Sequence, residues 1–237
     1  QLGKLAEQAL EILFKQAPSD MAQGEPKTAT DLLVKAWIIL AENRPARQEW
    51  SLDQVPRAKQ ERALEILANR LGQGNIEILH LRYDLTCNCR PYDYRQQIEL
   101  LEPLQATQYW IAPQLQLEYA ILLFQVGRPV EGDRAFRSLR RLWQTSEQFV
   151  QVPLRLRWLR SMDTKEPRTV RAINGSEYGT RAVALVREFS NTKVRFRPEE
   201  HGFRHDPPAR LAFTSYVSFG HNGPFLRPLS DPPPAAE

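Results

Sequence analysis

The final third of the chain interleaves basic side chains with aromatic rings. Residues 165–230 hold eleven Lys and Arg against six Asp and Glu, a formal charge of +5, whereas residues 1–164 hold twenty-one against twenty. Cations bind phosphates and flat rings stack on bases, at about 1–3 kcal/mol for each stack. We therefore expect RNA or single-stranded DNA to contact the following cations and rings: Arg171, Lys193, Arg195, Phe196, Arg197, Tyr216, Phe219, Phe225 and Arg227.

A second interpretation of these residues is open, in which the rings form the core of a small domain and the charges form its solvated face. Side chains alternate between the two faces of a strand. In residues 194–198 (VRFRP), Phe196 therefore shares a face with Val194, whereas Arg195 and Arg197 share the opposite face. That alternation separates this ring from its neighbouring cations.

A second basic cluster lies earlier in the chain, where residues 126–160 contain eight arginines. Basic patches attract nucleic acid and other polyanions, although the same charges also suit a solvated helix face. We expect four of these side chains to contact a partner protein: Arg134, Arg137, Arg140 and Arg141.

Other reactive side chains lack the pattern that a reaction requires. Cys87 and Cys89 have no second pair to complete a zinc site. The acidic and histidine residues of 199–206 suit a charged hairpin loop, and Ser215 with His221 shows no nucleophile turn. No glycine-rich phosphate loop is present. We therefore expect no enzyme activity, no catalytic residue, no metal site and no cofactor.

Apolar periodicity predicts that helices make up most of the chain before residue 160. Glycine and proline mark their ends, and Pro153 interrupts the last one. The expected helices cover residues 3–16, 28–42, 56–71, 75–86, 92–104, 115–126, 129–144 and, broken, 146–160.

Residues 115–142 resemble one tetratricopeptide repeat. The resemblance rests on Ala120, Gly127, Gly132 and Phe136, at the repeat's small-small-small-large spacing. The chain departs from the pattern where Gly132 replaces the usual alanine, and the consensus tryptophan and terminal proline are missing. Arg-Pro pairs at residues 44, 90 and 128 suggest a degenerate repeat of helical hairpins. The resemblance implies a stacked array whose groove binds a partner protein or peptide.

After residue 168 the period changes from helical to alternating. Five short strands are expected over 169–173, 181–187, 192–197, 210–219 and 223–227, with glycine-rich turns between them. Such a run predicts a small β-barrel. The fold class is therefore α+β: an all-α helical-repeat scaffold (1–160), a linker (161–168), a small barrel (169–229) and a disordered tail (230–237).

Two pieces of the barrel region resemble a cold-shock or other OB-like domain. One is the basic, aromatic strand at 194–198, and the other is the hairpin at 217–225 (VSFGHNGPF) with its Gly-x-x-Gly-Pro turn. Residues 176–179 (SEYG) echo a third strand of that family, but Thr180 follows where an aromatic ring is expected. The resemblance implies a barrel that binds single-stranded nucleic acid.

Together these patterns predict a non-catalytic interaction scaffold whose repeats bind a partner protein and whose barrel binds RNA or single-stranded DNA. An alternative is a regulatory or sensor portion of a larger protein, with the barrel serving protein docking only; the first residue, Gln1, favours a fragment. No apolar run is long enough to span a membrane. Two cysteines suit a reducing compartment, so we expect a cytoplasmic protein.

Overall fold

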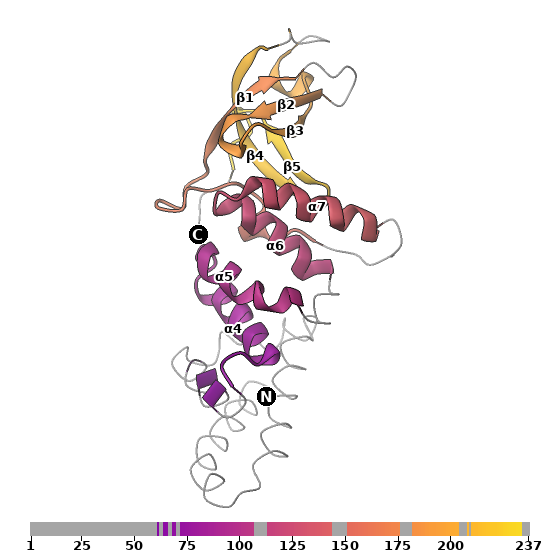
Figure 1. Cartoon of the computed structure of the whole chain (residues 1–237). Helices are drawn as coiled ribbons and strands as arrows, with labels where there is room; N and C mark the ends of the chain where they lie inside the picture. The colour runs from indigo at the N-terminus through magenta and orange to yellow at the C-terminus, as the bar shows by residue number, and fades with distance from the viewer. Residues whose placement is uncertain are drawn as a thin grey trace, which may run out of the picture. The chain divides into compact units, whose positions relative to one another are not determined.

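The computed structural model describes residues 61, 64, 65, 68, 69, 72–106, 113–143, 151–175, 182–203, 208 and 210–233 (Figure 1). The helices expected at 3–16 and 28–42, and most of the one at 56–71, lie outside the described residues. The chain divides into two compact units, Gln1–Arg90 and Pro91–Glu237.

Helix α4 (Ile76–Cys89) belongs to the first unit and confirms the helix expected near residue 75. Asn75 begins it, because its side-chain oxygen accepts a hydrogen bond from the Ile78 backbone N–H at 3.3 Å. Leu64 and Leu81 are buried against each other, with Leu85 packed beside them.

The described part of the second unit begins with three α-helices and a short 3₁₀ turn. These are α5 (Tyr94–Leu101), η3 (Pro103–Ala106), α6 (Pro113–Gln125) and α7 (Pro129–Trp143). Gly127 ends α6 with a φ of +80°, a left-handed conformation that glycine adopts without strain, and Pro129 begins α7. The hairpin expected from the Gly-x-Pro turn is therefore confirmed, whereas its membership of a repeat family stays a prediction.

Helix α6 is the centre of this unit. All nine residues from Leu117 to Gln125 are buried, so this part of the helix is packed on every side. Gly132 of α7 lies directly over Phe124: a Cβ placed on the glycine would come within 2.5 Å of the ring. The two helices can therefore pack closely only because this residue has no side chain.

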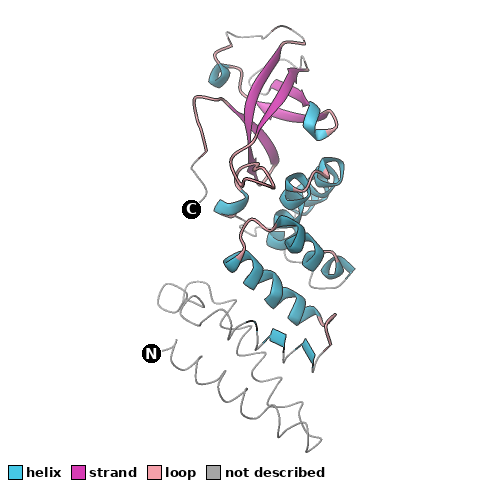
Figure 2. Ribbon diagram, turned by 90° about the vertical axis from the view of Figure 1, so that its left-hand side faces the viewer, coloured by secondary structure: helices cyan, strands magenta, loops and turns pink. Residues whose placement is uncertain are grey.

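Five strands form a closed barrel in the order β1-β2-β3-β5-β4 (Figure 2). The strands are β1 (Thr169–Asn174), β2 (Ala182–Val186), β3 (Thr192–Phe196), β4 (Ala212–Gly220) and β5 (Gly223–Arg227). Neighbours pair antiparallel except β3 with β5, which run parallel. Each strand lies within two residues of the range that the alternating pattern predicts, so the small barrel is confirmed.

The barrel core consists of small and β-branched side chains with a few rings. Buried residues alternate along β1, β2 and β3 as the pleat requires, whereas Val217, Ser218 and Phe219 of β4 are buried in succession. Among the buried residues are Val170, Ala172, Ala184, Val186, Val194, Phe196, Val217 and Leu226.

Residues 151–160 do not form the expected helix. They contain a 3₁₀ turn, η5 (Leu154–Leu156), followed by an extended segment in which Trp158 pairs with Ser218 of β4. Pro153 has extended backbone angles and no N–H to donate, so a helix cannot pass through it. Strand β1 pairs with β4 only as far as Tyr216, and the segment occupies the edge of β4 beyond that residue.

The helices and the barrel share one core. The Phe124 ring of α6 lies 6.1 Å from Phe136 of α7, 5.0 Å from Phe189 after β2 and 5.6 Å from Phe219 of β4, between ring centroids. Because four elements meet at one buried ring, the second unit folds around the α6–α7 hairpin as well as within the barrel.

Candidate functional site

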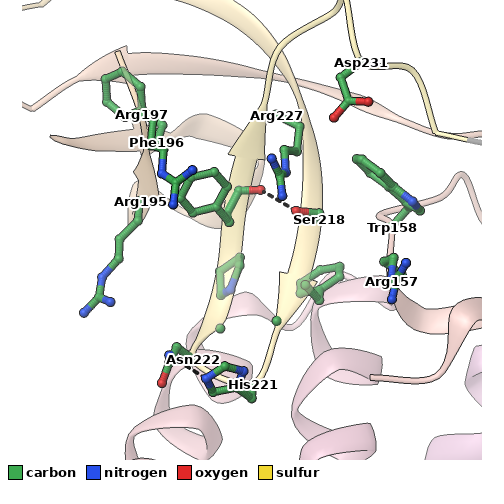
Figure 3. A pocket seen from close by; sticks show the side chains of 15 residues that line it. Arg157, Trp158, Arg195, Phe196, Arg197, Ser218, His221, Asn222, Arg227 and Asp231 are labelled. Carbon is green, nitrogen blue, oxygen red and sulfur yellow. Dashed lines mark hydrogen bonds between the residues drawn. The ribbon is translucent and has the colours of Figure 1, made fainter. Parts of the chain in front are cut away.

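A groove of about 1010 Å³ runs over the outer face of the β4–β5 hairpin (Figure 3). Its side chains come from four places: the extended segment before the barrel, the end of strand β3, the hairpin itself and the segment after β5. Four arginines line it, together with two half-buried rings and a single acid, Asp231. The arginines are Arg157, Arg195, Arg197 and Arg227, and the rings are Trp158 and Phe225.

One row of residues crosses the groove at right angles to the strands. Trp158 pairs with Ser218, Ser218 with Phe225, and Phe225 with Arg195, so all four share a face. Adjacent strands lie about 4.8 Å apart, so the row spans about 14 Å. Because Ser218 is the smallest residue of the row, a hollow lies between the rings of Trp158 and Phe225. Arg195 stands beyond Phe225 at one end of the row.

A second row, formed by Arg227 and Arg197, lies two residues further along the chain from Phe225 and Arg195. The Arg227 guanidinium lies 5.2 Å from the centre of the Phe225 ring, close enough for a cation–π contact. Glu200 approaches both neighbouring cations, at 2.9 Å from Arg197 and 3.4 Å from Arg227. This carboxylate therefore offsets part of the positive charge on one side of the groove.

Trp158 was missed by the sequence analysis, because the pattern placed it in a helix. Its segment is held between two partners. Leu159 N–H donates to Val217 of β4 at 2.9 Å, and on the other side the buried Gln125 amide of α6 donates to the Trp158 carbonyl at 2.7 Å. The Gln125 side-chain oxygen, Oε1, accepts a hydrogen bond from the Arg160 backbone N–H at 3.1 Å. One buried glutamine thus makes the hydrogen bonds that a neighbouring strand would otherwise make. In the sequence, a glutamine at the end of an apolar helix was the feature that could have indicated this contact.

Four of the nine residues expected to contact nucleic acid line the groove with exposed or half-buried side chains: Arg195, Arg197, Phe225 and Arg227. Phe196 is 0% exposed and Phe219 is 4% exposed, so both rings belong to the core, as the second interpretation has it. We leave these two rings out of the interface.

The other three expected contacts do not line the groove. Arg171 is exposed on β1, where its backbone N–H donates to the Glu188 carboxylate. Lys193 is exposed at the start of β3, two residues before Arg195. Tyr216 is half-buried and pairs in register with Arg227.

The arginines expected to contact a partner protein point to different places. Arg140 reaches the barrel, where its Nη2 donates to the Asn222 carbonyl at 2.9 Å. Arg137 forms an ion pair with Asp133 on the same helix. Arg134 lines a separate hollow of about 280 Å³ between η3, α6 and α7. The side chain of Arg141 lies outside the described residues.

A serine and a histidine do meet inside the barrel. The His201 Nε2 atom lies 3.2 Å from Ser215 Oγ, and burial lowers the pKa of His201 below its ordinary value of 6.5. Ser215 is fully buried, however, and its hydroxyl donates to the Arg227 carbonyl at 2.5 Å. No substrate can reach that hydroxyl, so the pair ties β4 to β5 and to the turn that holds His201.

Within the described ranges, His, Cys, Asp and Glu side chains nowhere gather in groups of three that would hold a metal ion. None of the described helices combines the length and the apolar character that crossing a membrane requires. Comparisons with protein-family models, curated proteins and solved structures give no match. Function must therefore be inferred from the groove itself.

Proposed function

We propose that the groove over the β4–β5 hairpin binds single-stranded nucleic acid. The observation that carries this proposal is the row that crosses the groove, in which Trp158 and Phe225 flank Ser218 and Arg195 completes one end. Two half-buried rings and several arginines thus share one face, which is the combination that a single strand needs.

The geometry favours a single strand over a duplex. The rings of Trp158 and Phe225 are half-buried within a hollow, so a ligand must present flat faces to them. Bases in a duplex already stack on each other, whereas those of a single strand are free to stack on protein rings. The surrounding arginines then contact the phosphates without reading the base sequence.

The barrel supports the same reading. Its closed order, with a parallel β3/β5 pair, is compatible with an OB-like barrel, a fold that often binds oligonucleotides. The two segments that resemble a cold-shock domain, 194–198 and 217–225, supply Arg195, Arg197 and Phe225 to the groove.

Fluorescence anisotropy of labelled single-stranded RNA and DNA against the full chain tests this proposal. We expect binding that weakens steeply between low and physiological salt. The double variant Arg195→Ala with Arg197→Ala should reduce the slope of log affinity against log salt by about 1.4, because two phosphate contacts are lost. Trp158→Ala should weaken binding of every sequence by about 1–3 kcal/mol.

A matched control removes two cations from the same barrel but outside the groove: Arg171→Ala with Lys193→Ala. We expect this variant to bind almost as the wild type does. Equal losses from the two double variants would mean that net charge alone attracts the strand. Absence of binding at low salt would exclude the proposal and favour a barrel that docks a protein.

The helices offer a second candidate function. The hollow between η3, α6 and α7 presents Arg134 beside Ser138, and the Glu131 carboxylate in its lining is already paired with Arg128, so the hollow suits an acidic peptide. We propose it as the partner site of the helical scaffold, which also suits a regulatory portion of a larger protein. Capture of a partner that is lost in Arg134→Glu, but retained in Arg195→Ala, would support it; an unaffected capture would exclude it.

A further inference from the structure

The turn of the β4–β5 hairpin rests on helix α7. The Arg140 Nη2 atom donates to the Asn222 carbonyl at 2.9 Å, and a Cβ placed on Gly223 would lie 3.5 Å from the same nitrogen and 3.7 Å from the Phe136 ring. Gly223 has a φ of +112°, which side chains rarely adopt. The backbone conformation therefore favours glycine here, and the distances show that the turn packs at van der Waals contact against this arginine and Phe136.

The contact holds Arg140 without neutralising it. A carbonyl group is neutral, and the Arg140 Nε atom is buried with no hydrogen-bond partner among the described residues. The nearest acid on its helix, Asp133, forms an ion pair with Arg137. The positive charge of Arg140 is therefore only partly balanced.

Arg195 brings a second positive charge to the same place. Burial lowers the pKa of Arg140 first, and the Arg195 guanidinium lowers it further, so the two like charges interact. In Figure 3 the Arg195 side chain extends from β3 toward the end of the barrel where the turn with His221 and Asn222 lies, and its guanidinium stands to the side of the hairpin. Arg195 thus lines the groove with its strand and approaches α7 with its charged end.

Helix α7 and strand β3 are in contact, and an anion placed between Arg140 and Arg195 would stabilise both cations. From this juxtaposition we propose that helix α7 extends the single-strand path: a phosphate that leaves the groove at Arg195 passes to Arg140 beside the hairpin turn. The inference rests on the proposed function and assigns Arg140 to the nucleic-acid surface instead of a protein interface. The interface would then include both the barrel and the helical hairpin.

Strand length provides the test. Labelled single-stranded DNA of about 4, 8, 12 and 16 nucleotides, the range that such barrels cover, is titrated against the full chain. We expect Arg140→Gln to leave the affinity for the shortest strand unchanged. For the longest strand it should lower the affinity by about threefold to tenfold and reduce the salt slope by about 0.7, the contribution of one phosphate.

Two further variants separate charge from structure. Arg140→Lys keeps the charge and should bind long strands nearly as the wild type does, whereas Arg134→Gln removes a charge from another side of α7 and should change nothing. Equal losses for short and long strands in Arg140→Gln, without rescue by lysine, would show that Arg140 only supports the hairpin and would overturn the inference.

The failures of the two proposals can be distinguished. If Arg195→Ala weakens binding at all lengths while Arg140→Gln binds all lengths as the wild type does, the groove stands and the extension over α7 falls. If the wild-type chain binds no strand at low salt, the proposed function falls and the extension falls with it.

Discussion

Glu200 limits how much of the groove's positive charge faces a ligand. Its carboxylate contacts Arg197 at 2.9 Å and Arg227 at 3.4 Å, and it is 26% exposed, whereas the two arginines are 63% and 38% exposed. Such partly exposed pairs contribute little to stability. They do compete with a phosphate for the same guanidinium groups, so this residue is expected to weaken binding.

We therefore expect Glu200→Gln to bind single-stranded nucleic acid about twofold to fivefold more tightly, which corresponds to the release of pairs worth up to about 1 kcal/mol. The salt dependence should become steeper, because phosphates then contact Arg197 and Arg227 without competition from a carboxylate. Anisotropy titrations at two salt concentrations check this. Glu199→Gln is the matched control, since Glu199 is exposed on the same turn; an equal gain there would reduce the effect to net charge.

At the scale of elements, the α6–α7 hairpin depends on the space above Phe124. A Cβ on Gly132 would lie 2.5 Å and 2.6 Å from two atoms of that ring. The ring is only 2% exposed and already touches Phe136, Phe189 and Phe219, so it has no room to move away. Close helix packing and the junction with the barrel therefore depend on the same glycine.

Gly132→Ala should destabilise the protein, even though alanine favours a helix by about 1 kcal/mol. Overpacking a buried site costs about 1–3 kcal/mol and here also disturbs the contacts of Phe124 with the barrel. We expect a lower Tm in thermal unfolding followed by circular dichroism. Gly220→Ala is the control, because a Cβ there would meet only the Gly223 carbonyl oxygen at 4.0 Å. A Tm at or above that of the wild type would contradict this packing argument.

At the scale of the whole second unit, the barrel depends on residues outside it to cover two of its rings and one of its edges. Phe189 and Phe219 lie against Phe124 of α6, and the edge of β4 is covered by the segment that contains Trp158. Gln125 fastens that segment from the helical side. Removing the helices and the segment with Trp158 would expose two rings and one edge of the sheet. Exposing each ring would destabilise the barrel by about 1.5–3 kcal/mol.

We therefore expect the piece 91–237 to unfold cooperatively on heating and the piece 165–237 to show no cooperative unfolding transition. A domain this small is only marginally stable, because it buries a small fraction of its surface. Circular dichroism and hydrogen exchange of the two pieces check this. A cooperative transition of similar midpoint in both would show that the barrel folds independently, and the boundary proposed from the sequence at residues 161–168 would then hold.

The sequence by itself determined the elements that depend on neighbouring residues. Alternation located all five strands and placed Phe196 opposite Arg195 and Arg197, because the side-chain period of a strand is a local property. The Gly-x-Pro turn before Pro129 located the α6–α7 hairpin for the same reason. Phe225 and three of the four arginines that line the groove, Arg195, Arg197 and Arg227, were likewise predicted from residue type and spacing.

Only the tertiary structure decided which of these residues meet. Trp158 joins the groove because β1 leaves the edge of β4 uncovered and Gln125, far away in the chain, holds the segment there. Phe219 turns inward because Phe124 packs on it, and Arg140 meets the hairpin turn. Register between strands and packing between a helix and a barrel depend on pairs of residues distant in sequence, which no local pattern records.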